Sequence, residues 1–197
     1  MITKNTPPIE LLPKTGINYI IEFYYEFNQI KQLLRQGWLK RGLPEEKCES
    51  VGDHILGVYF LALIINKEYN LGMDDYKLAL LSPIHDLPEA IEGDPTPHDG
   101  IPENEKIRRE TEAMRRLFRN FHSPEKYLAL WDEYARQSTP EARFVRQVDK
   151  LEMALQASIY EKQYGKDLSD FFVDVRSKLQ EPALKSILEE IITLRGR

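Results

Sequence analysis

An adjacent histidine and aspartate, His85 and Asp86, stand in a mostly apolar stretch of this sequence, and two more acids, Glu89 and Asp94, follow them. If the stretch is helical, Glu89 shares a face with His85 and Asp86, because residues three and four apart are neighbours on a helix. Ionisable groups in apolar surroundings need a balancing charge, and a bound metal cation is the simplest one. The alternative is a core histidine beside solvated acids, which the flanking leucines and isoleucines disfavour. The stretch therefore predicts a metal site.

Two more candidate ligands, His54 and Asp149, lie in other segments that read as helices. Taken alone, Asp149 is explained equally well by a surface ion pair with a neighbouring basic side chain. Taken with His54 and the His85-Asp86 pair, it completes a set of two imidazoles and two carboxylates from three helices. Mixed nitrogen and oxygen donors suit Mn, Co, Fe, Ni or Zn, and they argue against a structural thiolate site.

Positive charge gathers between Phe27 and Pro44, where the sequence has no acid but does have Lys31, Arg35, Lys40 and Arg41. In a chain of net charge −5, this stretch predicts a local basic patch. The planar guanidinium of an arginine is well matched to phosphate oxygens. Trp38 lies in the same stretch and either stacks on a ligand or is a buried structural residue, which is the commoner outcome.

The elements that must position these residues read as helices, since no segment shows sustained alternation of apolar and polar residues. Capping residues, such as Ser50 with Asp53 and Thr139 before a proline, mark several helix starts. Pro83 should kink or restart its helix. The fold class expected is all-α, with residues 1–15 as an extended segment and 16–197 as one compact helical bundle. The helices are expected near 17–35, 51–67, 74–91, 103–119, 124–136, 140–163, 167–178 and 182–194.

Composition excludes several classes of protein. The net charge of −5 argues against binding to nucleic acid. The longest apolar run, Val58 to Ile65, is too short to span a bilayer, and Met1 to Pro13 has no apolar core of a signal peptide. Cys48 is the only cysteine, so no disulfide forms within the chain. We therefore expect a cytoplasmic protein with no membrane or nucleic-acid partner.

The ordered set His54, His85-Asp86 and Asp149 resembles the H…HD…D signature of HD-domain metal-dependent phosphohydrolases. The resemblance is closest to the 5′-deoxynucleotidase branch of that family and covers roughly residues 27–160. The similar segments are Arg35 to Arg41 followed by Glu49 to His54, His85 to Ala90 followed by Gly93-Asp94, and Val145 to Asp149.

This resemblance implies a helical HD domain that hydrolyses deoxynucleoside 5′-monophosphates to deoxynucleoside and phosphate with one divalent transition metal. It also implies a homodimer. It implies roles for nine residues: His54, His85, Asp86 and Asp149 as metal ligands, Glu89 and Asp94 as catalytic acids, and Arg35, Trp38 and Arg41 as substrate-binding residues.

The chemistry of the residues agrees with this family. Glu89, one turn from His85, is placed to orient or deprotonate water or to pass a proton on. Two alternatives stay open: an HD enzyme acting on another nucleotide or metabolite phosphoester, and a non-catalytic binding protein with the HD fold. The complete ligand set and Glu89 argue against the second. His98 and His122 are expected to be exposed and not to bind the metal.

Overall fold

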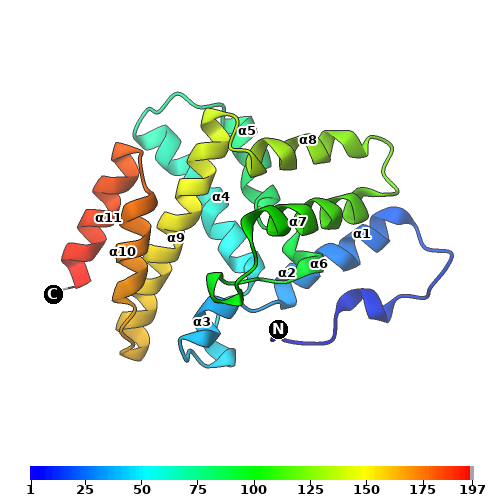
Figure 1. Cartoon of the computed structure of the whole chain (residues 1–197), viewed down its shortest axis with the longest axis horizontal. Coiled ribbons are helices and arrows are strands. Elements are labelled where there is room, and N and C mark those ends of the chain that lie inside the picture. Colours follow the sequence, from blue (N-terminus) through cyan, green and yellow to red (C-terminus); the bar gives the residue numbers. More distant parts are fainter. Residues whose placement is uncertain (196–197) are drawn as a thin grey trace. The chain divides into compact units, whose positions relative to one another are not determined.

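The computed structural model describes residues 1–195 and is built from helices (Figure 1). Across those residues the only β structure is two isolated bridges, Thr3 with Leu33 and Leu34 with Ser50. The all-α prediction is therefore confirmed. None of the helices within residues 1–195 has both the length and the apolar character needed to cross a membrane.

The chain divides into two units, each assembled from two separate stretches. Unit 1 consists of Met1–Leu56 and Pro83–Arg136, and unit 2 consists of Gly57–Ser82 and Gln137–Arg197. The predicted division into residues 1–15 and a single domain 16–197 stays a prediction. Residues 1–15 are not wholly extended, because they include a 3-10 helix, η1 (Pro8–Leu11).

The first part of unit 1 is made of short helices, and the prediction of one helix over 17–35 is wrong. The structure has α1 (Tyr19–Phe27), α2 (Gln29–Gln32), α3 (Gln36–Lys40) and η2 (Glu45–Lys47) before α4 (Val51–Glu68) begins. The helix ends at Gln32 because the next backbone groups bond to distant segments. The Leu33 carbonyl accepts from the Val51 N–H at 2.9 Å, and the Leu34 N–H donates to the Ile2 carbonyl at 3.3 Å.

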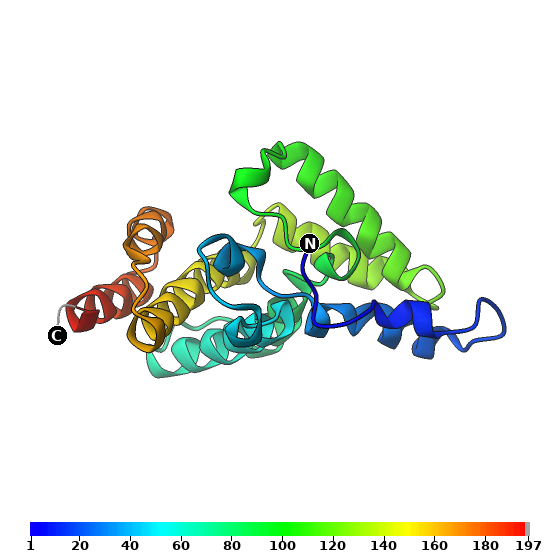
Figure 2. The same ribbon diagram turned by 90° about the horizontal axis from the view of Figure 1, so that it is seen from below.

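The second part of unit 1 contains α6 (Glu89–Glu92), η3 (Pro97–Asp99), α7 (Glu103–Phe118) and α8 (Pro124–Ala135). The α7 and α8 helices pack side by side as a hairpin (Figures 1 and 2). The buried positions of α7 follow the spacing of a single helix face, which is why it packs on one side only. They are Glu110, Ala113, Met114, Leu117 and Phe118.

A buried ion pair ties α1 to α7. Glu26 is 2% exposed and accepts from the guanidinium groups of Arg116, at 3.1 Å, and Arg119, at 3.0 Å. The arginines nearer the start of α7 form an exposed, salt-bridged face, since Arg108 and Arg109 both pair with Glu105.

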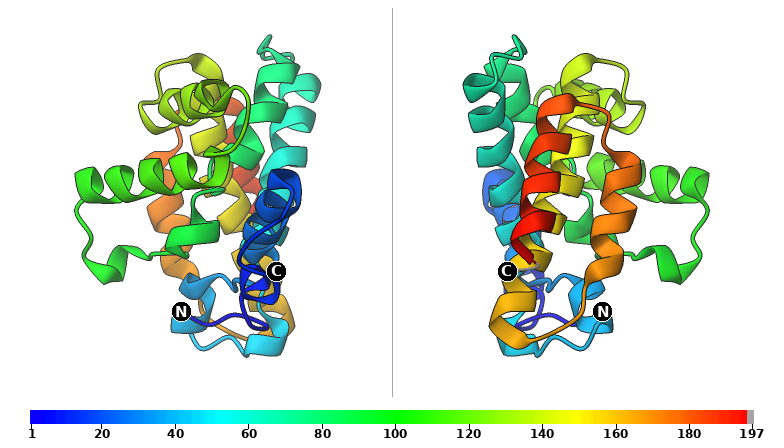
Figure 3. Two further views of the ribbon diagram at one scale, coloured as in Figure 1. Left: turned by 90° about the vertical axis from the view of Figure 1, so that its right-hand side faces the viewer. Right: turned by 90° about the vertical axis from the view of Figure 1, so that its left-hand side faces the viewer.

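Unit 2 holds most of α4, α5 (Asp75–Ile84), α9 (Pro140–Tyr164), α10 (Ser169–Lys178) and α11 (Pro182–Arg195). Both α10 and α11 pack against α9 (Figure 3, right). The hydroxyl of Thr139 accepts from the Ala142 N–H and caps the start of α9, as predicted. Gly165, with φ 64°, ends it in the left-handed conformation that glycine adopts without strain.

Most helix predictions are confirmed to within two residues, and the one for 74–91 is wrong in an informative way. The α5 helix ends at Ile84, directly after Pro83, and a short helix restarts at Glu89. Pro83, which has no N–H to continue the helix ladder, lies inside the last turn of α5, so the expected break falls just after it and the chain does not restart a helix at Pro83 itself. The confirmed helices are those expected at 51–67, 103–119, 124–136, 140–163, 167–178 and 182–194.

Candidate metal centre

The first candidate ligand, His54, lies in the first turn of α4 and is fully buried. A reciprocal cap fixes this turn, as the sequence predicts. The Ser50 N–H donates to the Asp53 carboxylate at 2.8 Å, and the Asp53 N–H donates to the Ser50 hydroxyl at 3.3 Å. The cap sets where α4 begins and therefore where the His54 ring points.

His85 and Asp86 lie in the turn between α5 and α6. The sequence placed them on a helix, and that placement is wrong. The turn is held by bonds three residues apart, from the Leu87 N–H to the Ile84 carbonyl and from the Glu89 N–H to the Asp86 carbonyl. These bonds fix the backbone that carries His85 and Asp86.

Three donor atoms meet in unit 1 at distances that suit one shared ion. His54 Nε2 lies 3.4 Å from His85 Nε2 and 3.6 Å from Asp86 Oδ2, and His85 Nε2 lies 3.3 Å from the same oxygen. Ligand atoms bound at ~2.1 Å around one ion lie roughly 3.0–3.4 Å apart at octahedral to tetrahedral angles. The donor set therefore fits a divalent transition metal in both type and spacing.

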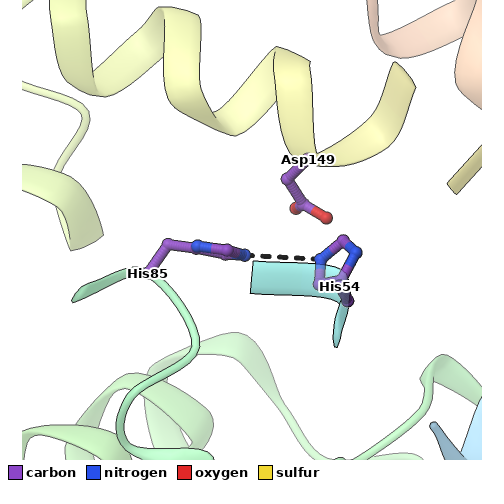
Figure 4. A group of neighbouring side chains, drawn as sticks. All are labelled: His54, His85 and Asp149. Carbon is purple, nitrogen blue, oxygen red and sulfur yellow. Dashed lines mark hydrogen bonds between the residues drawn. The ribbon is translucent and has the colours of Figure 1, made fainter. Parts of the chain in front are cut away.

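Asp149 lies on α9 in unit 2, whereas His54 and His85, joined by the dashed line in Figure 4, lie in unit 1. The Asp149 side chain is buried and also pairs with Lys150 Nζ at 2.9 Å. The ion pair that the sequence allowed for this aspartate is confirmed, and its role as a metal ligand stays a prediction.

Asp86 stays ionised in this cluster. Its burial alone would raise the pKa, but the charge and hydrogen bond of His85, together with Arg35, hold the pKa well below its usual range. An ionised carboxylate beside two imidazoles is the state in which such a group binds a cation.

Glu89, at the start of α6, is in the opposite electrostatic state. The residue is 4% exposed, and its Oε2 has no hydrogen-bond partner among residues 1–195. Burial, and then the negative charges of Asp86 and Asp94, raise the pKa of Glu89 well above its ordinary value. A buried carboxyl with an unpaired oxygen and a raised pKa is typical of groups that exchange protons during catalysis.

Arg35 and Asp94 form an ion pair beside this cluster. Arg35 Nη1 lies 3.1 Å from Asp94 Oδ1 and 3.5 Å from Asp86 Oδ2. The other oxygen of Asp94 accepts from the backbone N–H of Gln36 at 2.6 Å. Asp94 therefore lies beside Asp86, although it stands in the loop that follows α6. Sequence reasoning missed Gln36, because no side-chain pattern indicates the partner of a backbone N–H.

The basic stretch before Pro44 is less positive than the sequence suggests. Lys40 donates to the Asp99 carboxylate at 2.8 Å, and Arg35 is paired as described above, so acids compensate two of the four cations.

Trp38 is 2% exposed, and its indole N–H donates to Glu49 at 2.7 Å. This arrangement favours the structural explanation of Trp38. Arg41 is half-buried just after α3, and its substrate-binding role stays a prediction.

The remaining histidines, His98 and His122, are exposed, as expected. Neither belongs to a group of possible metal ligands within the part of the chain that the structure describes. The metal-binding potential of the imidazoles therefore rests on His54 and His85.

Comparisons with known proteins agree with this geometry. The sequence model of the HD domain family matches residues 27–192. The protein named 5′-deoxynucleotidase HDDC2 from Homo sapiens is 36% identical over 89% of this chain and 86% of its own length, and that from Bos taurus is 35% identical over 93% and 89%. The crystal structure of the PH0347 protein from Pyrococcus horikoshii superposes with a TM-score of 0.70 at 32% identity, covering 90% of this chain and 98% of that one.

Proposed function

This chain belongs to the HD domain family, and from that premise we propose that it is a metal-dependent 5′-deoxynucleotidase. Its substrates are deoxynucleoside 5′-monophosphates, and its products are the deoxynucleoside and phosphate. The observation that carries the proposal is the buried group of His54, His85 and Asp86 with the unpaired carboxyl oxygen of Glu89 nearby in sequence. The curated relatives that share this chain's length carry the same activity in their names.

The proposed metal ligands are His54, His85, Asp86 and Asp149. Their nitrogen and oxygen donors suit Mn, Co, Fe, Ni or Zn. A divalent ion bound there supplies a Lewis acid that polarises a phosphoryl oxygen and lowers the pKa of water. Elemental analysis of the protein purified from its native source identifies which metal it carries.

The side chains of the site have distinct tasks in this proposal. Glu89 orients the attacking water, gives its proton to the departing 5′-oxygen of the sugar and takes the proton that the attacking water releases. Arg35 provides the guanidinium that meets the phosphate oxygens. Asp94 holds Arg35 and contributes the second catalytic carboxylate, or binds the 3′-hydroxyl of the sugar. Arg41 is the second proposed cation for the substrate.

In this proposal Trp38 acts through its hydrogen bond to Glu49 and does not contact the substrate. With its indole buried against that carboxylate, it stabilises the segment that carries Arg35 and Arg41. Trp38→Phe keeps the ring and removes the N–H, so a change in substrate affinity in that variant measures how far this support matters. The prediction of direct contact with substrate would require the ring to become exposed on binding.

The direct test is an assay of phosphate release. Purified protein loaded with Mn or Co is offered deoxynucleoside and ribonucleoside 5′-monophosphates, cyclic nucleotides, nucleoside triphosphates and sugar phosphates. We expect turnover of the deoxynucleoside monophosphates and its loss in His54→Ala. If phosphate is released only from one of the other phosphoesters, the chain is an HD-type phosphohydrolase with a different substrate. No release from any of them, with bound metal, would favour a binding protein.

We also propose that two copies of the chain associate. Leu56, Phe60 and Ile64 lie one turn apart on α4 and are 56%, 53% and 53% exposed. A row of large apolar side chains on one helix face is typical of a surface that another protein covers. Light scattering should give the mass of a dimer, and Phe60→Glu should give that of a monomer. A monomeric wild type at micromolar concentration would contradict the proposal.

The proposed location is the cytoplasm. Cys48 is buried, and burial raises the pKa of its thiol to about 12, so it stays protonated and unreactive. A single inert thiol suits a reducing compartment. Fractionation of the source cells, with the protein followed by an antibody, tests this location.

A further inference from the structure

Residues 1–4, which we call the arm, run along residues 32–36 of unit 1 (Figure 2). The Lys4 N–H donates to the Gln32 carbonyl at 2.8 Å, and Thr3 forms a β-bridge with Leu33. These contacts place Ile2 next to the start of α3. The arm therefore contacts α3, and the first residue of α3, Gln36, binds Asp94.

The amide of Gln36 joins the arm to that element. Its Oε1 accepts from the Ile2 N–H at 3.0 Å, while its Nε2 donates to the Ile2 carbonyl at 3.0 Å and to the Leu34 carbonyl at 2.6 Å. Gln36 is 8% exposed. Both amide hydrogens and the amide oxygen are thus used in a buried setting, which fixes the side chain in one conformation.

The backbone of the same residue faces the site. The Gln36 N–H donates to Asp94 Oδ2 at 2.6 Å, and Asp94 Oδ1 accepts from Arg35 at 3.1 Å. Each oxygen of this buried carboxylate is therefore held by one donor. If the Gln36 N–H moves, Asp94 loses one of its two fixed contacts and Arg35 loses the carboxylate that orients it.

The chain on the far side of Asp94 is also constrained. Gly93 has φ 84° and ψ −176°, a conformation available essentially to glycine alone. Gly93 fixes the backbone just before Asp94, and the Gln36 N–H holds the carboxylate of Asp94. Neither residue carries charge or chemistry of its own, so their arrangement serves to orient the aspartate.

We propose that Gln36 is a positioning residue, which transmits the fixed geometry of the arm residue Ile2 through its backbone N–H to Asp94 and Arg35. The inference rests on the proposed function, in which those two residues handle the substrate. It assigns the arm a part in substrate binding, although no residue of the arm bears a catalytic group.

The kinetic test compares two glutamines changed in the same way. Gln36→Met keeps the length of the side chain and removes its three hydrogen bonds to Ile2 and Leu34. Gln32→Met is the matched control, because the Gln32 side chain bonds to Asn5 and Asn28 and to no residue of the site. We expect Gln36→Met to raise KM for the best deoxynucleotide about 5- to 10-fold with kcat changed less, and Gln32→Met to leave both within twofold. General loss of folded protein would lower the apparent kcat and leave KM unchanged.

A binding cycle tests whether Gln36 acts through Asp94. On the Glu89→Gln background, which is expected to bind substrate without turning it over, calorimetry gives Kd for the same deoxynucleotide with Gln36→Met, Asp94→Ala and both. If Gln36 acts through Asp94, the double change weakens binding no more than Asp94→Ala alone. Additive losses would overturn the inference, and so would an unchanged KM in Gln36→Met.

If Gln36→Met does not fold, Ile2→Pro is judged by the same criteria, because it removes the N–H that donates to Gln36 Oε1 and leaves Gln36 itself unchanged. A wild type that releases no phosphate overturns the proposed function and this inference with it. If the wild type is active, and KM and kcat of both Gln36→Met and Ile2→Pro equal those of the wild type, only the inference about Gln36 is overturned.

Discussion

Two glutamates in unit 1 are equally buried and have opposite surroundings. Glu26 on α1 is 2% exposed and accepts from Arg116 and Arg119, whereas Glu89 on α6 is 4% exposed and has an oxygen without a hydrogen-bond partner among residues 1–195. The first is a finished structural contact between two helices. The second keeps its bonding capacity for another group. Burial by itself therefore does not distinguish Glu89 from Glu26, but the hydrogen-bond partners of the two carboxyl groups do.

The largest effect is expected from Glu89→Gln. The substitution keeps the size of the side chain and removes its ability to exchange a proton, so kcat should fall about 10²- to 10⁴-fold. Metal content measured by elemental analysis should match that of the wild type, because Glu89 is not among the proposed ligands. A variant with full activity would remove Glu89 from the mechanism and make the two glutamates equivalent.

Glu26→Gln should show the reverse pattern. It removes two charge-assisted hydrogen bonds from a buried carboxylate, which costs about 1–3 kcal/mol in the free energy of unfolding. Urea denaturation measures this loss. Activity per folded molecule should stay within twofold of wild type. A selective loss of kcat without a loss of stability would contradict a purely structural role for Glu26.

A smaller effect, on stability and its pH dependence, should separate Glu89 from other acids. The pKa of Glu89 is raised in the folded chain above its ordinary value of 4.5. At pH values below 4.5, the folded and the unfolded chain therefore both keep Glu89 protonated. As the pH rises above that value, the unfolded chain ionises first, and the free energy of unfolding of the metal-free protein falls. Glu89→Gln should therefore unfold at a higher temperature than wild type at pH 7. At pH 4 the two should coincide, and a difference independent of pH would contradict the raised pKa.

The smallest effect is expected at an exposed acid of α7. Glu105 pairs with Arg108 and Arg109, and both arginines are largely in solvent. Such pairs are screened by water and salt and contribute little. Glu105→Gln should leave both activity and the unfolding midpoint near the wild-type values in a thermal scan. A loss as large as that of Glu26→Gln would show that an ion pair need not be buried to matter here.

Much of the fold was predictable because its signals are local. The caps at Ser50 and Thr139, and the restart after Pro83, depend on hydrogen bonds between residues a few positions apart. The break between α2 and α3 was not predictable, because it depends on backbone bonds from Leu33 and Leu34 to residues far along the chain.

The sequence by itself determined the kinds of donor atom at the candidate centre, since two imidazoles and two carboxylates in that order suit a transition metal wherever they meet. Only the tertiary structure decided which acid is paired and which is not, that Trp38 is buried, and that Gln36 holds Asp94. The physical reason is that side-chain type is written at each position, whereas desolvation and hydrogen-bond partners are supplied by residues many positions away.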